Sequence, residues 1–260
     1  MTQAGLIIER RGPVLLLTID REPVRNALDA ATAQAMDAAV TAAEADPAIG
    51  AVVLTGAGSR AFCSGMDLKE AAIHGAGHGL IPDRGFGGLT ERRRTKPLIA
   101  AINGTAVAGG FEILLACDLV FAADHAMMGL SEVRHGLFAF AGGIQRLARQ
   151  VPRATALAMI LTGELLPARR LYELGVVTEV VPRDQLLDRT LTVTQAMLGH
   201  SWTAIANGLK LHDLSAGMEI GQALAVGNAW GKATLDSAES VRGIAAFSAK
   251  STDARASPSQ

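Results

Sequence analysis

The sequence is poor in features that mark several classes of protein. Its 260 residues include two cysteines, Cys63 and Cys117, so a disulfide framework is excluded and a reducing compartment is expected. Lysine and arginine (24) almost balance aspartate and glutamate (25), which gives a net charge of −1. This balance argues against nucleic acid or an anionic membrane as the main partner. It is still compatible with a local basic site for a small anion.

The chain also lacks an uninterrupted apolar run that could span a membrane. The longest run, 98–123, contains Asn103, Glu112 and Asp118, and one carboxylate at the centre of a bilayer costs about 2.5–3.5 kcal/mol. Residues 1–11 lack the apolar core of a signal peptide. Hydrophobic residues nevertheless make up 49% of the chain and charged residues 19%, which excludes disorder. We therefore expect a folded, cytoplasmic protein.

Short apolar runs alternate with helical patterns along most of the chain. Two runs, 6–9 and 14–19, flank Gly12 and Pro13 and predict a β-hairpin. Further strands are expected at 51–55, 98–102 and 118–123, with helices at 28–45 and 110–117. This alternation favours an α/β architecture, although short strands that precede each helix in pairs fit a plain doubly wound sheet poorly.

The pattern changes near residue 183. Helix then follows helix, with expected ranges of 185–198, 202–212, 215–230 and 236–247. The polar residues 251–260 predict a frayed, flexible tail. The glycine-rich stretch 75–88 predicts a mobile loop, which either gates a site or is a variable surface connection.

Three local patterns lead to no chemistry. Residues 56–61 match G-x-G-x-x-A after a strand, but small, turn-forming residues follow where a dinucleotide site needs a helix. His74 and His78 have the spacing of metal ligands on a helix, but they lie among glycines with no third ligand nearby, so no metal site is expected. Ser64 lacks a nucleophile elbow and Cys63 lacks an identifiable partner histidine. Both are expected to pack against the backbone.

A stronger candidate lies at 106–115, where Gly109 and Gly110 precede a helical pattern with Glu112 in its first turn. The N-terminus of a helix leaves N–H groups unpaired and carries positive partial charge, and glycine lets a ligand approach closely. Such N–H groups can stabilise a carbonyl oxygen that gains negative charge, as an oxyanion hole requires. Glu112 alone is also explained by the general preference of acids for the first helical turn.

A second acid, Glu132, lies among apolar residues just ahead of Gly142 and Gly143. Apolar surroundings raise the pKa of a carboxyl group, which suits it to proton transfer near neutral pH. The alternative is an acid that caps a helix or pairs with a cation. The pattern alone does not show that Glu112 and Glu132 meet.

Several ordered motifs resemble those of the crotonase (enoyl-CoA hydratase/isomerase) superfamily. Residues 62–70 (FCSGMDLKE) resemble its signature turn, and 103–118, with Gly109-Gly110-Phe111-Glu112 and Cys117-Asp118, resembles its second signature. The resemblance continues through Ser131-Glu132, 142–147, 161–164, 175–177 and 180–182. It covers essentially the whole chain apart from the tail.

The resemblance implies an α/β fold of a particular kind. Residues 1–195 would form a spiral of ββα units that holds the active site and the CoA site. Residues 196–250 would form a helical region that builds a homotrimer, often paired into a hexamer (a dimer of trimers), and 251–260 would be a flexible tail. The family binds acyl-CoA thioesters, so CoA would belong to the substrate, and no metal or redox cofactor is implied.

The resemblance also assigns roles to individual residues. It places the two N–H groups of the oxyanion hole at Met66 and Gly109, and the two hydratase glutamates at Glu112 and Glu132. The residues that it places around CoA are Arg25, Ser64, Asp67, Leu68, Lys69, Phe247 and Lys250, the last two often across a subunit boundary. Two positions depart from the family pattern. Met66 stands where a small residue is usual, and Phe140 stands where well-known hydratases have glycine beside the catalytic water.

The implied activity is that of an enoyl-CoA hydratase, which adds water reversibly across the C2=C3 bond of 2-enoyl-CoA. The two glutamates would hold the water, deliver it to C3 and supply the proton at C2. Isomerases of the family commonly keep one acid, so the pair favours hydration. Phe140 leaves three alternatives: an enoyl-CoA isomerase, a specialised acyl-CoA dehydratase, and a catalytically silent acyl-CoA-binding protein.

Overall fold

The computed structural model describes residues 2–75 and 77–256, without the side chains of His74 and of residues 248–256. It divides the chain into two compact units, Met1–Gly199 and His200–Gln260, here called the core unit and the helical unit. The end of the expected tail, 257–260, and the side chain of Lys250 lie outside the described residues.

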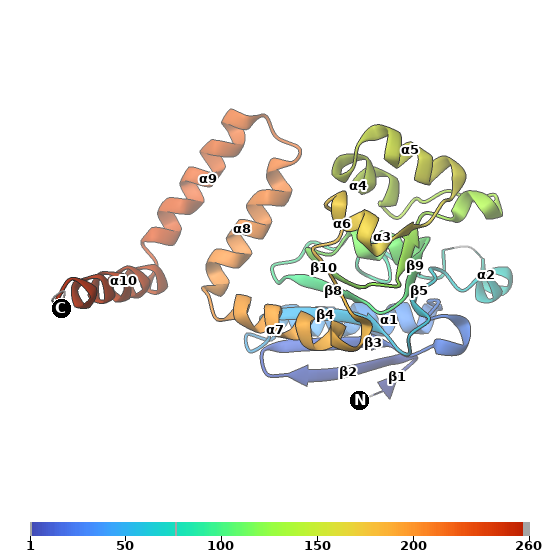
Figure 1. Cartoon of the computed structure of the whole chain (residues 1–260), viewed down its shortest axis with the longest axis horizontal. Helices are drawn as coiled ribbons and strands as arrows, with labels where there is room; N and C mark the ends of the chain where they lie inside the picture. The colour runs from blue at the N-terminus through green and yellow to red at the C-terminus, as the bar shows by residue number, and fades with distance from the viewer. Residues whose placement is uncertain (1, 76, 257–260) are drawn as a thin grey trace. The chain divides into compact units, whose positions relative to one another are not determined.

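A seven-stranded sheet forms the centre of the core unit (Figure 1), with the order β1-β2-β3-β4-β8-β10-β13. Its strands are β1 (Thr2–Gln3), β2 (Leu6–Arg11), β3 (Val14–Ile19), β4 (Ala51–Gly56), β8 (Leu98–Ile102), β10 (Leu119–Ala123) and β13 (Glu179–Val181). The predicted hairpin is confirmed, because β2 and β3 pair antiparallel. From β3 to β13 every neighbouring pair is parallel.

A second sheet has the order β12-β11-β9-β5. Its strands are β5 (Ala61–Cys63), β9 (Thr105–Val107), β11 (Met127–Gly129) and β12 (Leu166–Pro167). Three times a strand of the main sheet is followed by a strand of this sheet and then by a helix: α2 (Leu68–His74), α3 (Gly109–Leu115) or α4 (Gly143–Gln150). The chain therefore repeats a ββα unit, and the predicted α/β architecture with paired short strands is confirmed.

The remaining helices of the core unit cover or connect these sheets. They are η1 (Glu22–Val24), α1 (Ala30–Ala45), η2 (Glu132–His135), α5 (Arg153–Thr162), α6 (Ala168–Glu173), η3 (Arg183–Gln185) and α7 (Leu186–Leu198). The stretch predicted as a loop at 75–88 instead contains a short hairpin of β6 (Leu80–Ile81) and β7 (Gly85–Phe86). Phe86 is 5% exposed, so the second half of this stretch belongs to the core.

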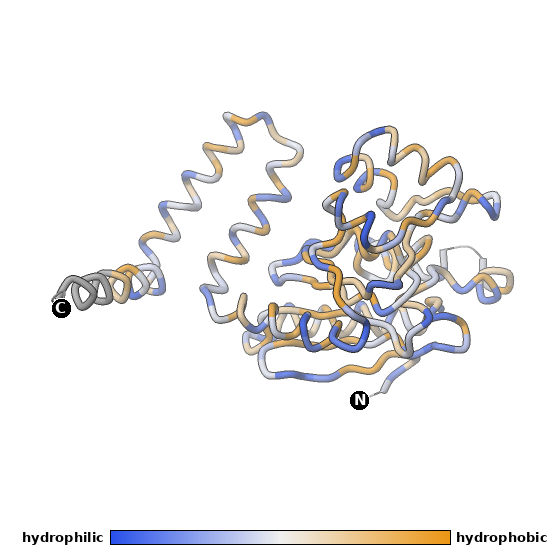
Figure 2. Tube along the Cα trace, in the orientation of Figure 1, coloured by the Kyte–Doolittle hydropathy of each residue, from blue (hydrophilic) through white to orange (hydrophobic). Residues whose placement is uncertain are grey.

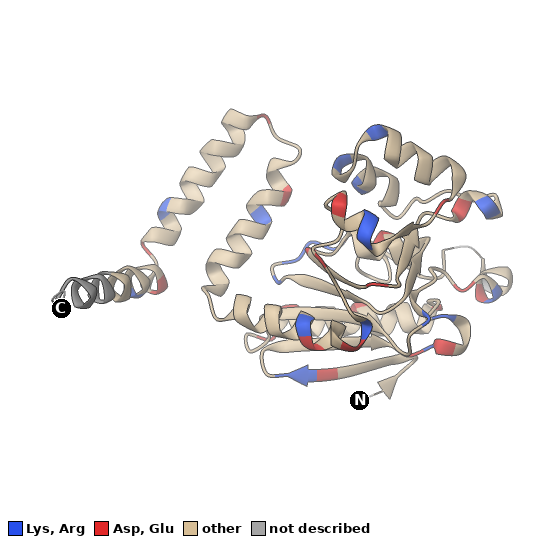
Figure 3. Cartoon of the chain, viewed as in Figure 1, with Lys and Arg blue, Asp and Glu red and all other residues tan. Residues whose placement is uncertain are grey.

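The central strands are buried along their whole length. All residues of β4 and β8 are buried, as expected for parallel strands that are covered on both faces. Figure 2 shows hydrophobic residues running through these strands, and Figure 3 shows that they carry no charged residues. Charged groups near the sheet therefore lie at the strand ends, where they can fix the turns.

The helical unit contains α8 (Trp202–Ser215), α9 (Ile220–Leu235) and α10 (Ala238–Ala256). Helices α8 and α9 pair through a hydrogen bond of 3.0 Å from Asn207 Nδ2 to Thr234 Oγ1 and through Lys210, whose Nζ lies 4.9 Å from the centre of the Trp230 ring. Within the part of the chain that the structure describes, no helix is long and apolar enough to cross a membrane.

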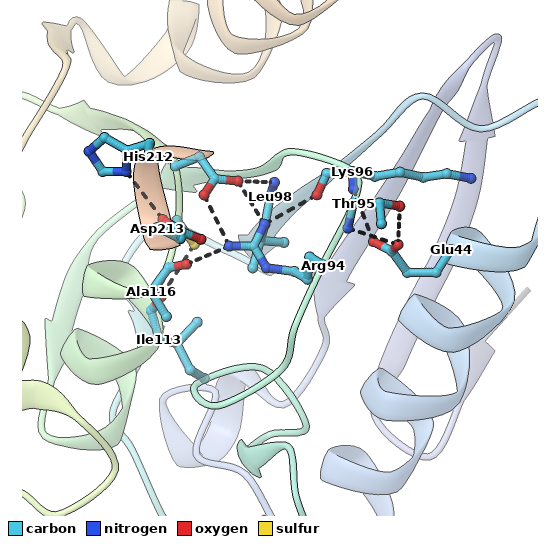
Figure 4. Close-up of polar contacts among 11 residues, drawn as sticks. Glu44, Arg94, Thr95, Lys96, Leu98, Ile113, Ala116, His212 and Asp213 are labelled. Carbon is cyan, nitrogen blue, oxygen red and sulfur yellow. Dashed lines mark hydrogen bonds and ion pairs between the residues drawn. The ribbon is translucent and has the colours of Figure 1, made fainter. Parts of the chain in front are cut away.

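An ion pair fixes the starts of β8 and β10. Arg94 donates from both terminal nitrogens to Asp118, over 2.7 and 3.0 Å, and also donates to the carbonyl of Ala116 over 2.9 Å. Asp118 accepts from the backbone N–H of Leu98 over 2.7 Å. Figure 4 shows Arg94 beside Ala116 and Leu98, and Glu44 bound to Thr95 and Lys96. The Arg94 side chain is 9% exposed, so loss of Asp118 would leave a buried charge.

We therefore expect Asp118→Asn to lower the free energy of unfolding by about 3 kcal/mol, as is usual when one partner of a buried pair is removed. Chemical denaturation would measure the change. The matched control is Asp124→Asn just past the other end of β10, where the side chain is 64% exposed and little change is expected. Equal losses in the two variants would contradict the role of the Arg94–Asp118 pair.

Candidate active site

A cavity of about 500 Å³ opens in the core unit where the turns after β5, β9 and β11 meet. Its walls come from five segments, 23–27, 64–69, 77–80, 107–109 and 131–141, together with Phe86 and Glu112. The cavity therefore brings together stretches that are far apart in the sequence.

The turn after β5 is held by a parallel bridge between Leu28 and Met66. Leu28 N donates to Gly65 O over 2.8 Å, and Asp67 N donates to Leu28 O over 2.9 Å. In a planar trans peptide the C=O and the following N–H point in opposite directions. Because the Gly65 carbonyl points at Leu28, the Met66 N–H points away from Leu28. Met66 lines the cavity, so its N–H is available on that side.

The same turn packs closely against the start of α3. A Cβ at Gly65, where φ is +88°, would lie 2.9 Å from Gly109 N, and a Cβ at Gly110 would lie 2.1 Å from the carbonyl oxygen of Cys63. Only glycine allows this approach. Gly109 is the first residue of α3 and lines the cavity, and an N–H at that position has no partner within its helix. Two backbone donors thus come from adjacent turns.

Ala108, which precedes α3, adopts φ 50° and ψ −128°. A positive φ is strained for alanine. Its N–H donates to Gly129 O over 3.1 Å, a bond that ties this turn to β11. The strain accompanies the sharp change of direction that starts α3 at the cavity wall.

Glu112 lies in the first turn of α3 and is 4% exposed. Its Oε1 accepts a hydrogen bond of 2.9 Å from Gly143 N. Burial raises the pKa of this carboxyl group, while backbone hydrogen bonds from Gly143 and Ala141 and the charge of Arg146 oppose the rise. Glu112 is therefore held in one orientation by contacts that favour its ionised form.

Glu132 begins η2 and is 9% exposed. Within the described residues, neither carboxylate oxygen has a hydrogen-bond partner. Burial, with the nearby charge of Glu112, raises the pKa of Glu132 to about 7, although its own backbone N–H opposes the rise. A carboxyl group with this pKa is poised to give or take a proton near neutral pH.

The structure answers the question that the sequence pattern left open, because both acids line the cavity that Met66 and Gly109 also line. Two backbone donors can hold an oxygen that gains negative charge. Two carboxyl groups held in different environments can divide the roles of base and acid. The arrangement suits proton transfer at carbons next to a carbonyl group.

Five of the residues predicted to surround CoA line this cavity: Arg25, Ser64, Asp67, Leu68 and Lys69. The Asp67 carboxylate already binds Arg21 Nη2 and Lys69 N, each over 3.1 Å, so its contacts are structural. Phe247 belongs to the helical unit and is 76% exposed. The role of Phe247 in CoA binding stays a prediction, and that of Lys250 falls on a side chain outside the described residues.

Phe140 lines the cavity and is 51% exposed. Phe138, which sequence reasoning missed, also lines it; the two ring centres lie 6.0 Å apart and the planes are inclined by 57°. The spacing of Phe138 and Phe140 could have predicted that both rings line the same surface, because alternate residues of an extended segment share a face. Sequence reasoning also missed Phe86, whose ring approaches so closely that a Cβ on Gly109 would lie 2.5 Å from it.

Metal-ligating side chains are not clustered in the described residues. Within residues 2–75 and 77–256, no group of three or more histidine, cysteine, aspartate or glutamate side chains is placed to hold a metal ion. Besides the backbone donors and carboxyl groups, the side chains of Arg25, Ser64, Lys69 and His135 line the cavity.

The raised pKa of Glu132 predicts a pH-dependent stability. The pKa is about 7 in the folded chain and 4.5 when unperturbed, so folding favours the protonated carboxyl group. The stability that this group contributes is complete below pH 4.5 and is lost as the pH rises to 7. We expect the free energy of unfolding of Glu132→Gln to exceed that of the native protein by about 1–3 kcal/mol near pH 8. Near pH 4 the difference should be much smaller.

Urea titrations at the two pH values would measure this effect, with Glu164→Gln as the control because Glu164 is exposed. A difference between Glu132→Gln and the native protein that does not change with pH would contradict the raised pKa.

Comparisons with known proteins place the chain in a family. The enoyl-CoA hydratase/isomerase family model matches residues 9–254. A Salmonella arizonae protein named carnitinyl-CoA dehydratase is 39% identical over 203 residues, which are 78% of this chain and 77% of that protein. The structure of an enoyl-CoA hydratase from Mycobacterium tuberculosis has a TM-score of 0.90 at 34% identity and covers 95% of this chain and 96% of its own. That of a carnitinyl-CoA hydratase from Mycobacterium avium has a TM-score of 0.76 at 37% identity and covers 96% and 97%. The chain therefore belongs to the enoyl-CoA hydratase/isomerase family, the crotonase superfamily that its motifs resemble.

Proposed function

We propose that this protein catalyses the reversible addition of water to the C2=C3 bond of a 2-enoyl-CoA thioester. The observation that carries the proposal is the coupled pair of buried carboxyl groups, Glu112 and Glu132, in one cavity with the backbone donors of Met66 and Gly109. An acyl-CoA-binding protein without activity needs no such pair, because each buried acid costs free energy of folding.

In the proposed reaction, the N–H groups of Met66 and Gly109 hold the thioester oxygen and stabilise the enolate that forms when oxygen bonds to C3. Glu112, whose carboxylate is oriented by the hydrogen bond from Gly143 N, takes a proton from the attacking water. Glu132, whose pKa of about 7 keeps a substantial protonated fraction at neutral pH, gives its proton to C2. The hydroxyl group of water ends on C3, one proton is added at C2, and Glu112 passes its proton back to Glu132 through solvent.

The step involves no net oxidation or reduction, so we propose no redox cofactor. We also propose no metal, because the N–H groups of Met66 and Gly109 would stabilise the negative charge on the thioester oxygen. CoA would be part of the substrate. Arg25 and Lys69 would supply the local basic site for the CoA phosphates. The helical unit would form the homotrimer or hexamer. Ile220, Leu224 and Leu235 of α9 are 58–69% exposed in the single chain, and an interface would cover such side chains.

A second candidate function is favoured by the aromatic wall of the cavity. The faces of Phe138 and Phe140 can hold a quaternary ammonium group through cation–π attraction. Relatives named carnitinyl-CoA dehydratase share 37–39% of the aligned residues with this chain. The corresponding reaction would be dehydration of a 3-hydroxyacyl-CoA that carries a trimethylammonium group on C4, with the same two glutamates in the reverse direction.

Both acids should be needed for turnover. With crotonyl-CoA as substrate, Glu112→Gln and Glu132→Gln should each lower kcat by about 10²–10⁴, because each removes a proton carrier. The affinity for CoA should stay within about threefold, since neither glutamate is among the residues expected around CoA. Loss of the enoyl-thioester absorbance would measure turnover, and Glu164→Gln is the control. Turnover at the native rate in either active-site variant would remove that residue from the mechanism.

The charge on C4 of the acyl group distinguishes the two candidate substrates. Two enoyl-CoA substrates are matched in shape, one with a trimethylammonium group on C4 and the other with a tert-butyl group there. If the second candidate is right, kcat/KM is about tenfold higher for the cationic substrate, because a desolvated cation–π contact contributes about 1–2 kcal/mol.

In that case Phe138→Leu combined with Phe140→Leu should bring the ratio close to one. Equal kcat/KM values for the two substrates in the native protein would exclude the quaternary ammonium substrate and leave the uncharged enoyl-CoA.

A further inference from the structure

A partly buried ion-pair cluster lies behind the turn that carries Met66. At its centre is Arg21, whose side chain is 18% exposed. Arg21 Nη2 contacts Asp29 Oδ2 over 2.9 Å and Asp67 Oδ2 over 3.1 Å, and Nη1 donates to Ala27 O over 2.5 Å. Arg21 is not among the residues that line the cavity, so its place is behind the wall.

The three partners of Arg21 surround the Leu28–Met66 bridge. Ala27 and Asp29 flank Leu28, and Asp67 directly follows Met66. One planar guanidinium group therefore binds both strands of the bridge at once, a geometry that the single point charge of lysine cannot reproduce.

The two carboxylates also set the starts of two helices. Asp29 accepts from Thr32 N over 2.7 Å at the start of α1, and Asp67 accepts from Lys69 N over 3.1 Å at the start of α2. Arg21 thus links the ends of two helices to the turn between β5 and α2. Any shift of Asp67 would turn the neighbouring Met66 peptide, because the two residues share one bridge to Leu28.

We propose that Arg21 is a positioning residue for the reaction: it fixes the direction of the Met66 N–H at the thioester oxygen. The inference rests on the proposed function, in which that N–H forms half of the oxyanion hole. Donors of this kind act through their fixed orientation, and a small displacement weakens transition-state stabilisation more than substrate binding. Loss of Arg21 should therefore act on kcat.

The test needs a readout that a purely stabilising ion pair would not move. A conjugated thioester, 4-(dimethylamino)cinnamoyl-CoA, absorbs at longer wavelength when donors pull electron density onto its carbonyl oxygen. The red shift of the bound probe reports the strength of the oxyanion hole without turnover. The variants are Arg21→Gln, Arg21→Lys and Asp29→Asn. The last of these keeps the side-chain oxygen that caps α1 and removes the charge.

The matched control is Arg94→Gln, which breaks the buried pair with Asp118 at a distant strand end. We expect the Arg21 variants to lower kcat by about 10–100-fold with KM within about threefold, a smaller effect than complete removal of an oxyanion donor. The red shift should shrink in parallel. Arg94→Gln should lower the Tm while the red shift and kcat per folded molecule stay unchanged.

The outcomes separate this inference from the proposed function. A native protein that binds the probe without a red shift would overturn the oxyanion hole itself. A native red shift that is retained in full in folded Arg21 variants would overturn the positioning role of Arg21 and leave the proposed function standing. If Arg21→Gln does not fold, Arg21→Lys and Asp29→Asn decide: an unchanged red shift in both overturns the inference, and a reduced one supports it.

Discussion

The site depends on the contact between the turn after β5 and the first residues of α3. Gly65 and Gly110 allow these two backbones to approach within distances that any side chain would forbid. This contact places the Met66 and Gly109 peptides side by side at the cavity, and α3 then carries Glu112 inward from its first turn. The donors are main-chain groups, so their positions are set by the fold rather than by the side chain at residue 66. A methionine side chain at residue 66 therefore leaves the donor in place.

The two buried acids suit proton transfer but destabilise the fold. Glu132 is buried with no hydrogen-bond partner for its carboxylate among the described residues, and such a group opposes folding at neutral pH. Glu112 next to it raises the pKa of Glu132 further. The surrounding scaffold must compensate. The strands β4 and β8 are wholly buried, the Arg94–Asp118 pair fixes the chain where β8 and β10 begin, and the Arg21–Asp29–Asp67 cluster fixes the turn behind the cavity wall. The stable parts of the core unit are thus arranged around an unfavourable pair of carboxyl groups.

The local sequence was sufficient to predict most of the strands and helices. It was insufficient to predict which of their residues come together in the cavity. The hairpin of β2 and β3, the buried strands β4 and β8 and the start of α3 follow from apolar runs and from glycine placement. That Glu112 and Glu132 share a cavity came from family resemblance, because their convergence depends on the parallel pairing of β9 with β11. The hairpin at 80–86 was mistaken for a loop, since its many glycines suggested mobility while Phe86 anchors it in the core. Arg21 gave no signal, because the sequence of a turn does not distinguish an exposed arginine from one that is partly buried in ion pairs.

The groups that would carry out the chemistry and the side chains that would select the substrate lie in different parts of the site. In the proposed reaction, backbone donors and two acids set the class of chemistry. They lie in the ββα units of a fold that solved structures with 34–37% identity share. The segment between Glu132 and Gly142 is different: Leu137, Phe138 and Phe140 are 42–64% exposed and line the cavity. Exposed side chains in such a wall can change with little cost to stability, whereas a substitution at Gly65 or Gly110 would force the two backbones apart. In the proposed reaction, substrate preference would therefore reside in these exposed side chains, which the fold leaves free to vary.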